Sequence, residues 1–270
     1  MARTMHFISG LPRSGSTLLS ALLRQNPRFA AGVASPLASL FDAVQPAMSN
    51  GEFGVFFDDE TRLTMLRGLF DSYYAKEARP VAFDSNRSWT GRTALLAQLF
   101  PDARIICCVR EIGWIVNSVE RMLAANPAQR SRLFNFQTGT SAYARAEALM
   151  HIDNGMIGLA WATLREAWFG PEARRLILVP YEHLAKEPHR TLRRLYQALD
   201  EEYFVHDTAN VEFSTERYDD YLGMPGLHTV RRKVEQREQQ PMIPPDIFFK
   251  YAQTQFWEKP EMNTGGALII

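Results

Sequence analysis

An eight-residue segment near the N-terminus combines two glycines, three hydroxyl side chains and one cation. It spans Gly10–Thr17 and reads GLPRSGST. An apolar run at Met5–Ser9 precedes it and leucines at helical spacing follow over Leu18–Leu23, so the segment joins a strand to a helix. Its glycines let backbone N–H groups turn inward, and the helix N-terminus adds partial positive charge. We predict a pocket for a phosphate-like anion, with Arg13 as its cation; the alternative is a turn whose glycines serve geometry alone.

The glycine spacing is that of nucleotide-binding P-loops, except at one position. Ser16 stands where a P-loop has its lysine, and the cation is Arg13 instead. In a nucleoside triphosphatase that lysine neutralises the terminal phosphates, and an acidic residue on another strand helps to hold magnesium. Here the most apolar later strand ends in Arg110 rather than in an aspartate. The pattern favours a donor with less charge at its reacting end and no need of a metal, as in sulfuryl transfer.

The composition limits where such an anion can bind. The 270 residues carry 30 Lys+Arg and 30 Asp+Glu, a net charge of zero, which disfavours nucleic-acid binding by bulk attraction and requires a local anion site. The hydrophobic fraction of 46% and charged fraction of 22% are those of a globular chain. With no repeat or linker, we expect a single domain over residues 1–270.

Cysteine usage and hydropathy indicate the compartment. Cys107 and Cys108 are adjacent in an apolar run, where neighbouring side chains on a strand point to opposite faces and do not bond each other. No apolar stretch approaches the roughly 18 residues of a membrane span, and Met1–Gly10 lacks the apolar segment of a signal peptide. We expect a soluble, cytoplasmic protein in a reducing environment. The oligomeric state is not indicated.

Short apolar runs alternate with helical periodicity along the chain. This alternation predicts the α/β class, with a P-loop, nucleotide kinase-like parallel sheet flanked by helices. Strands are expected at Met5–Ser9, Val81–Asp84, Arg104–Val109 and Leu176–Pro180. The pattern is lost in a polar excursion at about 126–151, which we interpret as a cover for a site or a plain surface insertion. A C-terminal segment at about 217–270 holds a basic cluster and an aromatic helix near Phe248–Trp257.

The glycine loop within Phe7–Leu19 resembles the 5′-phosphosulfate-binding loop of sulfotransferases that use 3′-phosphoadenosine 5′-phosphosulfate (PAPS). Its form is similar to the tyrosylprotein branch and its bacterial relatives. The resemblance implies PAPS as donor, adenosine 3′,5′-bisphosphate (PAP) as product, no metal, and catalysis by Arg13. The loop residues implied to bind the nucleotide are Pro12, Arg13, Ser14, Gly15, Ser16 and Thr17.

Further matches follow in the family's order. An arginine that ends a strand and a serine eight residues later, Arg110 and Ser118, resemble the pair that holds the 3′-phosphate. Arg110 offers a two-pronged cationic donor at the carboxyl end of a strand, where such sheets bind ligands. Tyr181 resembles a tyrosine that borders the nucleotide, or else caps the core at a strand end. Arg87 falls where the tyrosylprotein enzymes have a lysine, and is either a second catalytic cation or a surface charge.

A basic cluster near the C-terminus resembles the segment that closes over the nucleotide in the family. Its residues are Arg231, Arg232 and Lys233, for which a solvated face is the alternative.

The proton acceptor is where this sequence departs from the tyrosylprotein enzymes. Their catalytic glutamate follows the first helix, and an ungapped alignment puts Val33 at that position. Other acceptors are Asp84, His151 and His228, each of which is more often structural, and the base stays unassigned.

We therefore expect a PAPS-dependent sulfotransferase whose acceptor is a hydroxyl of a small molecule or carbohydrate rather than a peptide tyrosine. The alternatives are a P-loop kinase or nucleoside triphosphatase, or a non-catalytic nucleotide-binding relative.

Overall fold

A computed structural model describes residues 3–125, 127, 141–214, 216–236, 240–252 and 254–270. Its centre is a six-stranded sheet in the order β2-β3-β1-β4-β5-β6, with every neighbouring pair parallel. The strands are β1 (Thr4–Gly10), β2 (Phe29–Ala31), β3 (Val81–Ser85), β4 (Ile105–Val109), β5 (Leu176–Pro180) and β6 (Leu268–Ile269). The predicted α/β class is confirmed, and the four predicted strands are β1, β3, β4 and β5.

The central strands are apolar on both sides because helices cover both faces of the sheet. In β4, Ile105, Cys107 and Val109 pack into one core cluster, whereas Ile106 and Cys108 pack into the other. This is the period-two alternation of an extended chain. Both cysteines are buried and free, as their opposite orientations require.

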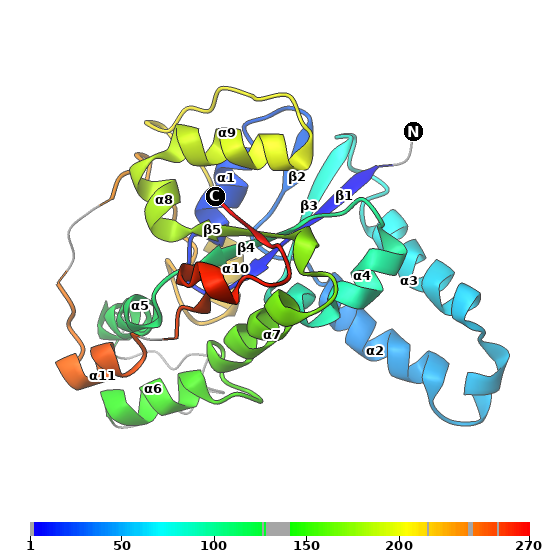
Figure 1. The fold of residues 1–270 in the computed structure, drawn as a ribbon, viewed down its shortest axis with the longest axis horizontal. Helices are drawn as coiled ribbons and strands as arrows, with labels where there is room; N and C mark the ends of the chain where they lie inside the picture. The colour runs from blue at the N-terminus through cyan, green and yellow to red at the C-terminus, as the bar shows by residue number, and fades with distance from the viewer. Residues whose placement is uncertain (1–2, 126, 128–140, 215, 237–239, 253) are drawn as a thin grey trace.

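Two helical layers enclose the sheet (Figure 1). One layer comprises α1 (Ser16–Leu23), α8 (Tyr181–Lys186) and α9 (Pro188–Leu199). The other comprises α2 (Leu37–Ser49), α3 (Asp59–Tyr73), α4 (Thr93–Leu99), α5 (Ile112–Ala125), α6 (Ala142–Met150), α7 (Gly158–Phe169) and α11 (Pro245–Lys250). Helix α10 (Glu216–Tyr221) and the short 3-10 helices η1 (Glu52–Phe56), η2 (Arg87–Arg92), η4 (Ala173–Arg175), η5 (Phe256–Glu258) and η6 (Pro260–Met262) complete the described elements.

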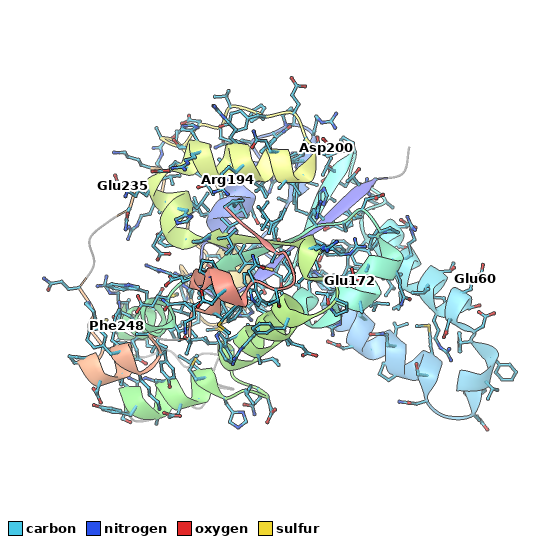
Figure 2. All side chains as sticks on the ribbon, viewed as in Figure 1. Glu60, Glu172, Arg194, Asp200, Glu235 and Phe248 are labelled. Atoms are coloured by element: carbon cyan, nitrogen blue, oxygen red, sulfur yellow. The ribbon has the colours of Figure 1, made fainter. Side chains whose placement is uncertain are left out.

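The peripheral elements differ from the sequence expectations. Residues 142–150 of the polar excursion form α6, while residues 126 and 128–140 lie outside the described residues. The expected aromatic helix near Phe248–Trp257 is two short pieces, α11 and η5, and that expectation was wrong. Helices α2 and α3 form a hairpin that extends from the body, with Glu60 at its far end (Figure 2). No helix in the described ranges has the length and apolarity to cross a membrane.

The carboxyl ends of β1, β3, β4 and β5 meet at one edge of the sheet. β1 ends at Gly10, which pairs with Cys108 of β4. Its φ of 97° lies in the left-handed region, and a Cβ atom there would lie 2.7 Å from the Cys108 amide nitrogen. Only glycine lets the chain leave the sheet so close to β4. The residues after the other strands, including Arg110 and Tyr181, start at the same edge.

Candidate active site

A cavity of about 650 Å³ opens at this edge. Its walls come from the Gly10–Thr17 loop, the chain after β3, Arg110, the second half of α5, one side of α8, and residues 218–235. Within the described part of the chain, six cationic side chains and one carboxylate, that of Glu235, line it. The cations are Arg13, Arg87, Arg110, Arg121, Arg231 and Lys233. A chain of zero net charge thus concentrates positive charge at one place, as a local anion site requires.

The glycine loop turns in one tight step from β1 into α1. Arg13 and Gly15 both have positive φ, 57° and 93°, and α1 begins at Ser16. Ser14 is buried, and its hydroxyl donates to the Pro12 carbonyl at 3.2 Å, which closes the turn. A Cβ at Gly15 would lie 3.0 Å from the Tyr181 ring. The N-terminus of α1 and the Tyr181 ring therefore border the same space.

Arg13 joins three distant segments. Its Nε donates to Ser118 Oγ on α5 at 3.1 Å, and one of its terminal nitrogens donates to the Leu227 carbonyl. Burial lowers the pKa of Arg13, and the positive charge of Arg110 lowers it further. Arg13 and Ser118 resemble family residues that hold opposite ends of a nucleotide, and here the two side chains touch and line the same cavity.

Arg110 lies at the start of the turn into α5, with its guanidinium carbon 4.3 Å from the centre of the Tyr181 ring. This cation–π contact fixes the plane of the guanidinium. Its Nε lies 3.5 Å from Glu182 Oε1, close enough for an ion pair, yet this buried nitrogen has no hydrogen-bond partner. Burial lowers the pKa of Arg110. The Arg110 guanidinium therefore lines the cavity next to one carboxylate, that of Glu182, which is not itself part of the lining.

Arg87 enters the cavity from η2. The Asn86 side chain caps this helix by accepting from the Ser88 amide at 3.0 Å, and the Ser9 hydroxyl donates to the Arg87 carbonyl at 2.9 Å. The Arg87 side chain stays open to solvent through the cavity, although the surrounding walls desolvate it and lower its pKa. Ser85, which also lines the cavity, has a buried hydroxyl without a partner.

A histidine–aspartate pair lies at the cavity, and His228 is the member that lines it. His228 Nδ1 lies 2.6 Å from Asp219 Oδ1, and the His228 amide donates to Asp219 Oδ2 at 2.9 Å. Asp219 is buried. Burial lowers the pKa of His228 and the charges of Arg13 and Arg87 lower it too, while Asp219 opposes them. His228 is therefore neutral at pH 7, with the Nδ1 proton directed to the carboxylate.

Several residues singled out from the sequence lie elsewhere. Arg232 does not line the cavity but donates to Asn210 Oδ1, at 2.6 Å from Nη2. His151 is exposed at the end of α6 and lines neither large cavity. Lys233 does line the cavity and pairs with Glu235 at 3.1 Å. Arg231 also lines it, so the basic cluster is divided between the cavity and the outer surface.

Asp84 is a structural residue. It is fully buried in β3, and its carboxylate accepts from Ser35 Oγ at 2.7 Å, Trp89 Nε1 at 2.8 Å and the Tyr74 hydroxyl at 2.9 Å. It lines neither of the two large cavities. Val33 does line the cation-lined cavity, so the position of the family's glutamate faces the site without a carboxylate.

The sequence analysis missed Asp219, Tyr218 and Arg121. Tyr218 and Arg121 line the cavity, and the Tyr218 ring lies 5.4 Å from the ring of His228. Nothing in the spacing of Asp219 and His228 marks them as a pair, because α10 and the turns after it bring them together. A pattern search for histidine with a nearby acidic residue is the one signal that could have found them.

Comparison with known proteins places the chain in a family. A family model described as "Sulfotransferase family" matches residues 6–205. The chain belongs to the sulfotransferase family. No curated protein matched the sequence.

Solved structures of sulfotransferases share the fold. The sulfotransferase domain from the curacin biosynthetic pathway has a TM-score of 0.52 at 16% identity, covering 76% of each chain. The sulfotransferase domain of the Synechococcus PCC 7002 olefin synthase has a TM-score of 0.52 at 18% identity, covering 94% of each chain. A sulfotransferase from Alicyclobacillus acidocaldarius has a TM-score of 0.51 at 16% identity, covering 82% of this chain and 90% of that one.

Proposed function

We propose that this sulfotransferase moves the sulfuryl group of PAPS to a hydroxyl of an acceptor, releasing PAP. The observation that carries the proposal is the cavity that the Arg13 loop and the Arg110–Ser118 pair share. Its described lining has five more positively charged side chains than carboxylates. A nucleotide with anionic groups at both ends suits that distribution, because each end then meets its own cation. The Arg110 guanidinium, which lies over Tyr181 at the carboxyl end of β4, supports the placement of one phosphate beside it.

The nucleotide-binding residues divide between its two ends. We assign the 5′-phosphosulfate to Pro12, Arg13 and the amides of Ser14, Gly15, Ser16 and Thr17, at the N-terminus of α1. We assign the 3′-phosphate to Arg110 and Ser118, with Tyr181 beside the nucleotide. Arg231 and Lys233, from the C-terminal segment, complete the wall of the cavity. We no longer assign Arg232 to nucleotide binding, because its guanidinium donates to Asn210.

Catalysis in this proposal is positioning and charge stabilisation. Negative charge grows on the sulfuryl oxygens and on the bridging oxygen as the acceptor attacks. Arg13 and Arg87 stabilise that charge, and fixed donors there act more strongly on the transition state than on the ground state. Arg13 is already held by the fold, through Ser118 and Leu227, so it needs no reorganisation at the moment of reaction.

His228 is the base that this geometry supports best. With Nδ1 directed to Asp219, Nε2 is the ring nitrogen left for the cavity. His228 then accepts the proton of the acceptor hydroxyl while that oxygen bonds to sulfur and the bridging oxygen leaves with PAP. Asp219 holds the tautomer and stabilises the imidazolium that forms. This role replaces the glutamate that the chain lacks at Val33.

Calorimetry with PAP tests the nucleotide assignment. Arg110→Ala removes a charge-assisted pair of hydrogen bonds and should weaken PAP binding about tenfold or more. Arg232→Ala is the matched control. This arginine belongs to the same basic cluster as Arg231 but does not line the cavity, so its loss should leave the affinity for PAP unchanged. No binding of PAP to the wild-type protein would overturn the proposal.

Turnover then separates an enzyme from a non-catalytic relative. Arg13→Ala should lower sulfuryl transfer from PAPS about a hundredfold, the usual cost of one preorganised donor. Near-normal turnover of that variant would contradict the role of Arg13. A magnesium requirement with ATP as donor would favour a kinase instead. The cytoplasmic location belongs to the same proposal and is checked by cell fractionation.

A further inference from the structure

A second and larger cavity adjoins the cation-lined one. It has a volume of about 1130 Å³ and is lined by η2, the first turn of α4, one side of α7 and part of α2. Asn86, Arg87 and Met156 line both cavities. Because we place Arg87 beside the sulfuryl group, a molecule in the second cavity meets the reacting centre at that residue. Its volume exceeds the roughly 300–1,000 Å³ of most ligand pockets, so an extended molecule fits.

The two cavities differ in charge. In the second one, the carboxylates of Asp42 and Glu166 balance the guanidinium groups of Arg87 and Arg92, counting the described lining residues. Arg92 is held at the wall, because it pairs with Asp42 and donates to the Ser88 carbonyl at 3.1 Å. A wall without excess positive charge does not compensate the desolvation of an anionic acceptor. The balance favours an uncharged one.

The apolar side chains in the wall of the second cavity are aliphatic. Its described lining includes no aromatic ring; the aliphatic members are Ala94, Leu95, Met156, Leu159, Ala160, Ala167 and Pro171. The hydroxyls of Thr90 and Thr163 bond to each other at 3.0 Å, so these lining groups are already satisfied. Such a wall buries a hydrocarbon chain favourably but offers an aryl ring no stacking partner.

We infer that this second cavity binds an uncharged aliphatic alcohol. We call it the acceptor cleft; residues 86–95, residues 154–171 and α2 contribute to its lining. The carbon chain of the alcohol lies along the α7 side and its hydroxyl points to Arg87. The inference rests on the proposed function and adds the acceptor class to it. An aryl alcohol and a tyrosine peptide are the acceptors that it disfavours.

The test measures kcat/KM for sulfuryl transfer from PAPS to ethanol, 1-butanol, 1-hexanol and 1-octanol. Burial of the chain along the cleft should raise kcat/KM about fourfold per added methylene until the cleft is full. Leu159→Glu places a charge on the aliphatic wall and should flatten this dependence. Phe169→Glu is the matched control on the same helix: the two side chains are similarly exposed, 44% and 46%, but Phe169 lies outside the cleft.

Each outcome decides the inference. The inference is overturned if kcat/KM is independent of chain length or if no alkanol accepts the sulfuryl group. A preference for p-nitrophenol, a tyrosine peptide or glucose over 1-octanol also overturns it. Equal effects of Leu159→Glu and Phe169→Glu overturn the place assigned to the chain. PAP calorimetry on the same preparations keeps the failures apart, because loss of the acceptor class leaves PAP binding intact, whereas failure of the proposed function removes it.

Discussion

At the scale of single residues, the cavity depends on side chains that hold one another in place. Arg13 is tied to Ser118 and to the Leu227 carbonyl, Arg110 lies over Tyr181, and His228 is oriented by Asp219. Held side chains lose less entropy when a ligand arrives, so the charges are preorganised. The histidine is the residue whose protonation changes in the working pH range.

Loss of the proposed base should show in the pH profile. The pKa of His228 is lowered below its usual 6.5, so kcat/KM should be constant above that range and fall about tenfold per pH unit once the pH drops below the histidine's pKa. Asp219→Asn removes the carboxylate that opposes this lowering, so the acid limb should move to lower pH. His228→Gln should abolish the limb and reduce turnover about 10²–10⁴-fold.

His151→Gln is the control for this experiment, because His151 is exposed and lines neither large cavity. It should keep both the rate and the limb. An unchanged acid limb in His228→Gln would show that another group accepts the proton.

At the scale of elements, the site is built from the ends of parallel strands, and the closest approach is between β1 and β4. Gly10 faces Cys108 across this pair, and the Leu11 amide donates to the Cys108 carbonyl at 2.8 Å. Any side chain at Gly10 would meet the Cys108 backbone, which cannot move without disturbing the centre of the sheet. The same contact sets where the Arg13 loop begins.

Gly10→Ala should lower the free energy of unfolding by roughly 3 kcal/mol or more, because it combines a positive φ with a backbone clash. Urea denaturation measures the change. Gly68→Ala in α3 is the matched control: a Cβ there meets nothing within 4 Å, so the variant should gain about 0.5–1 kcal/mol of stability from helix propensity. A neutral Gly10→Ala variant would mean that β1 and β4 separate easily.

At the scale of the whole molecule, two buried histidines couple folding to pH. His6 lies on β1 and its Nδ1 accepts from the Arg104 amide at 3.1 Å, while His206 Nε2 lies 3.0 Å from the Tyr196 hydroxyl. Burial lowers the pKa of each to about 4. The unfolded chain therefore binds more protons than the folded one between pH 6.5 and 4, and stability falls as the pH falls through this window.

The free energy of unfolding should decrease between pH 6.5 and pH 4, by about 3 kcal/mol at most for each histidine. Denaturant unfolding at several pH values measures the slope. His206→Gln should reduce that slope by about half, whereas His151→Gln, at an exposed position away from both histidines, should leave it unchanged. A wild-type stability that is flat across this window would contradict the coupling.

Local patterns in the sequence determined the parallel sheet, the glycine turn and the arginines at strand ends. Apolar runs such as Ile105–Val109 are buried on both faces only in a covered parallel sheet, and the carboxyl ends of such strands meet at one edge. Strand ends and the glycine turn therefore predicted an anion pocket with Arg13 and a cation, Arg110, at the ligand-binding edge. The nucleotide and the place of Tyr181 beside it came from the resemblance to PAPS-dependent sulfotransferases. Elements without such a pattern were missed, among them α6, whose helix-favouring residues follow a polar run.

Contacts between segments far apart in the chain were decided by the tertiary structure alone. It paired His228 with Asp219, turned Arg232 to Asn210 and enclosed Asp84 among three donors. It also joined the acceptor cleft to the cation-lined cavity at Arg87, through packing of α7 against η2. Periodicity records which face of an element is buried, but the partner that a polar side chain meets depends on how distant elements pack.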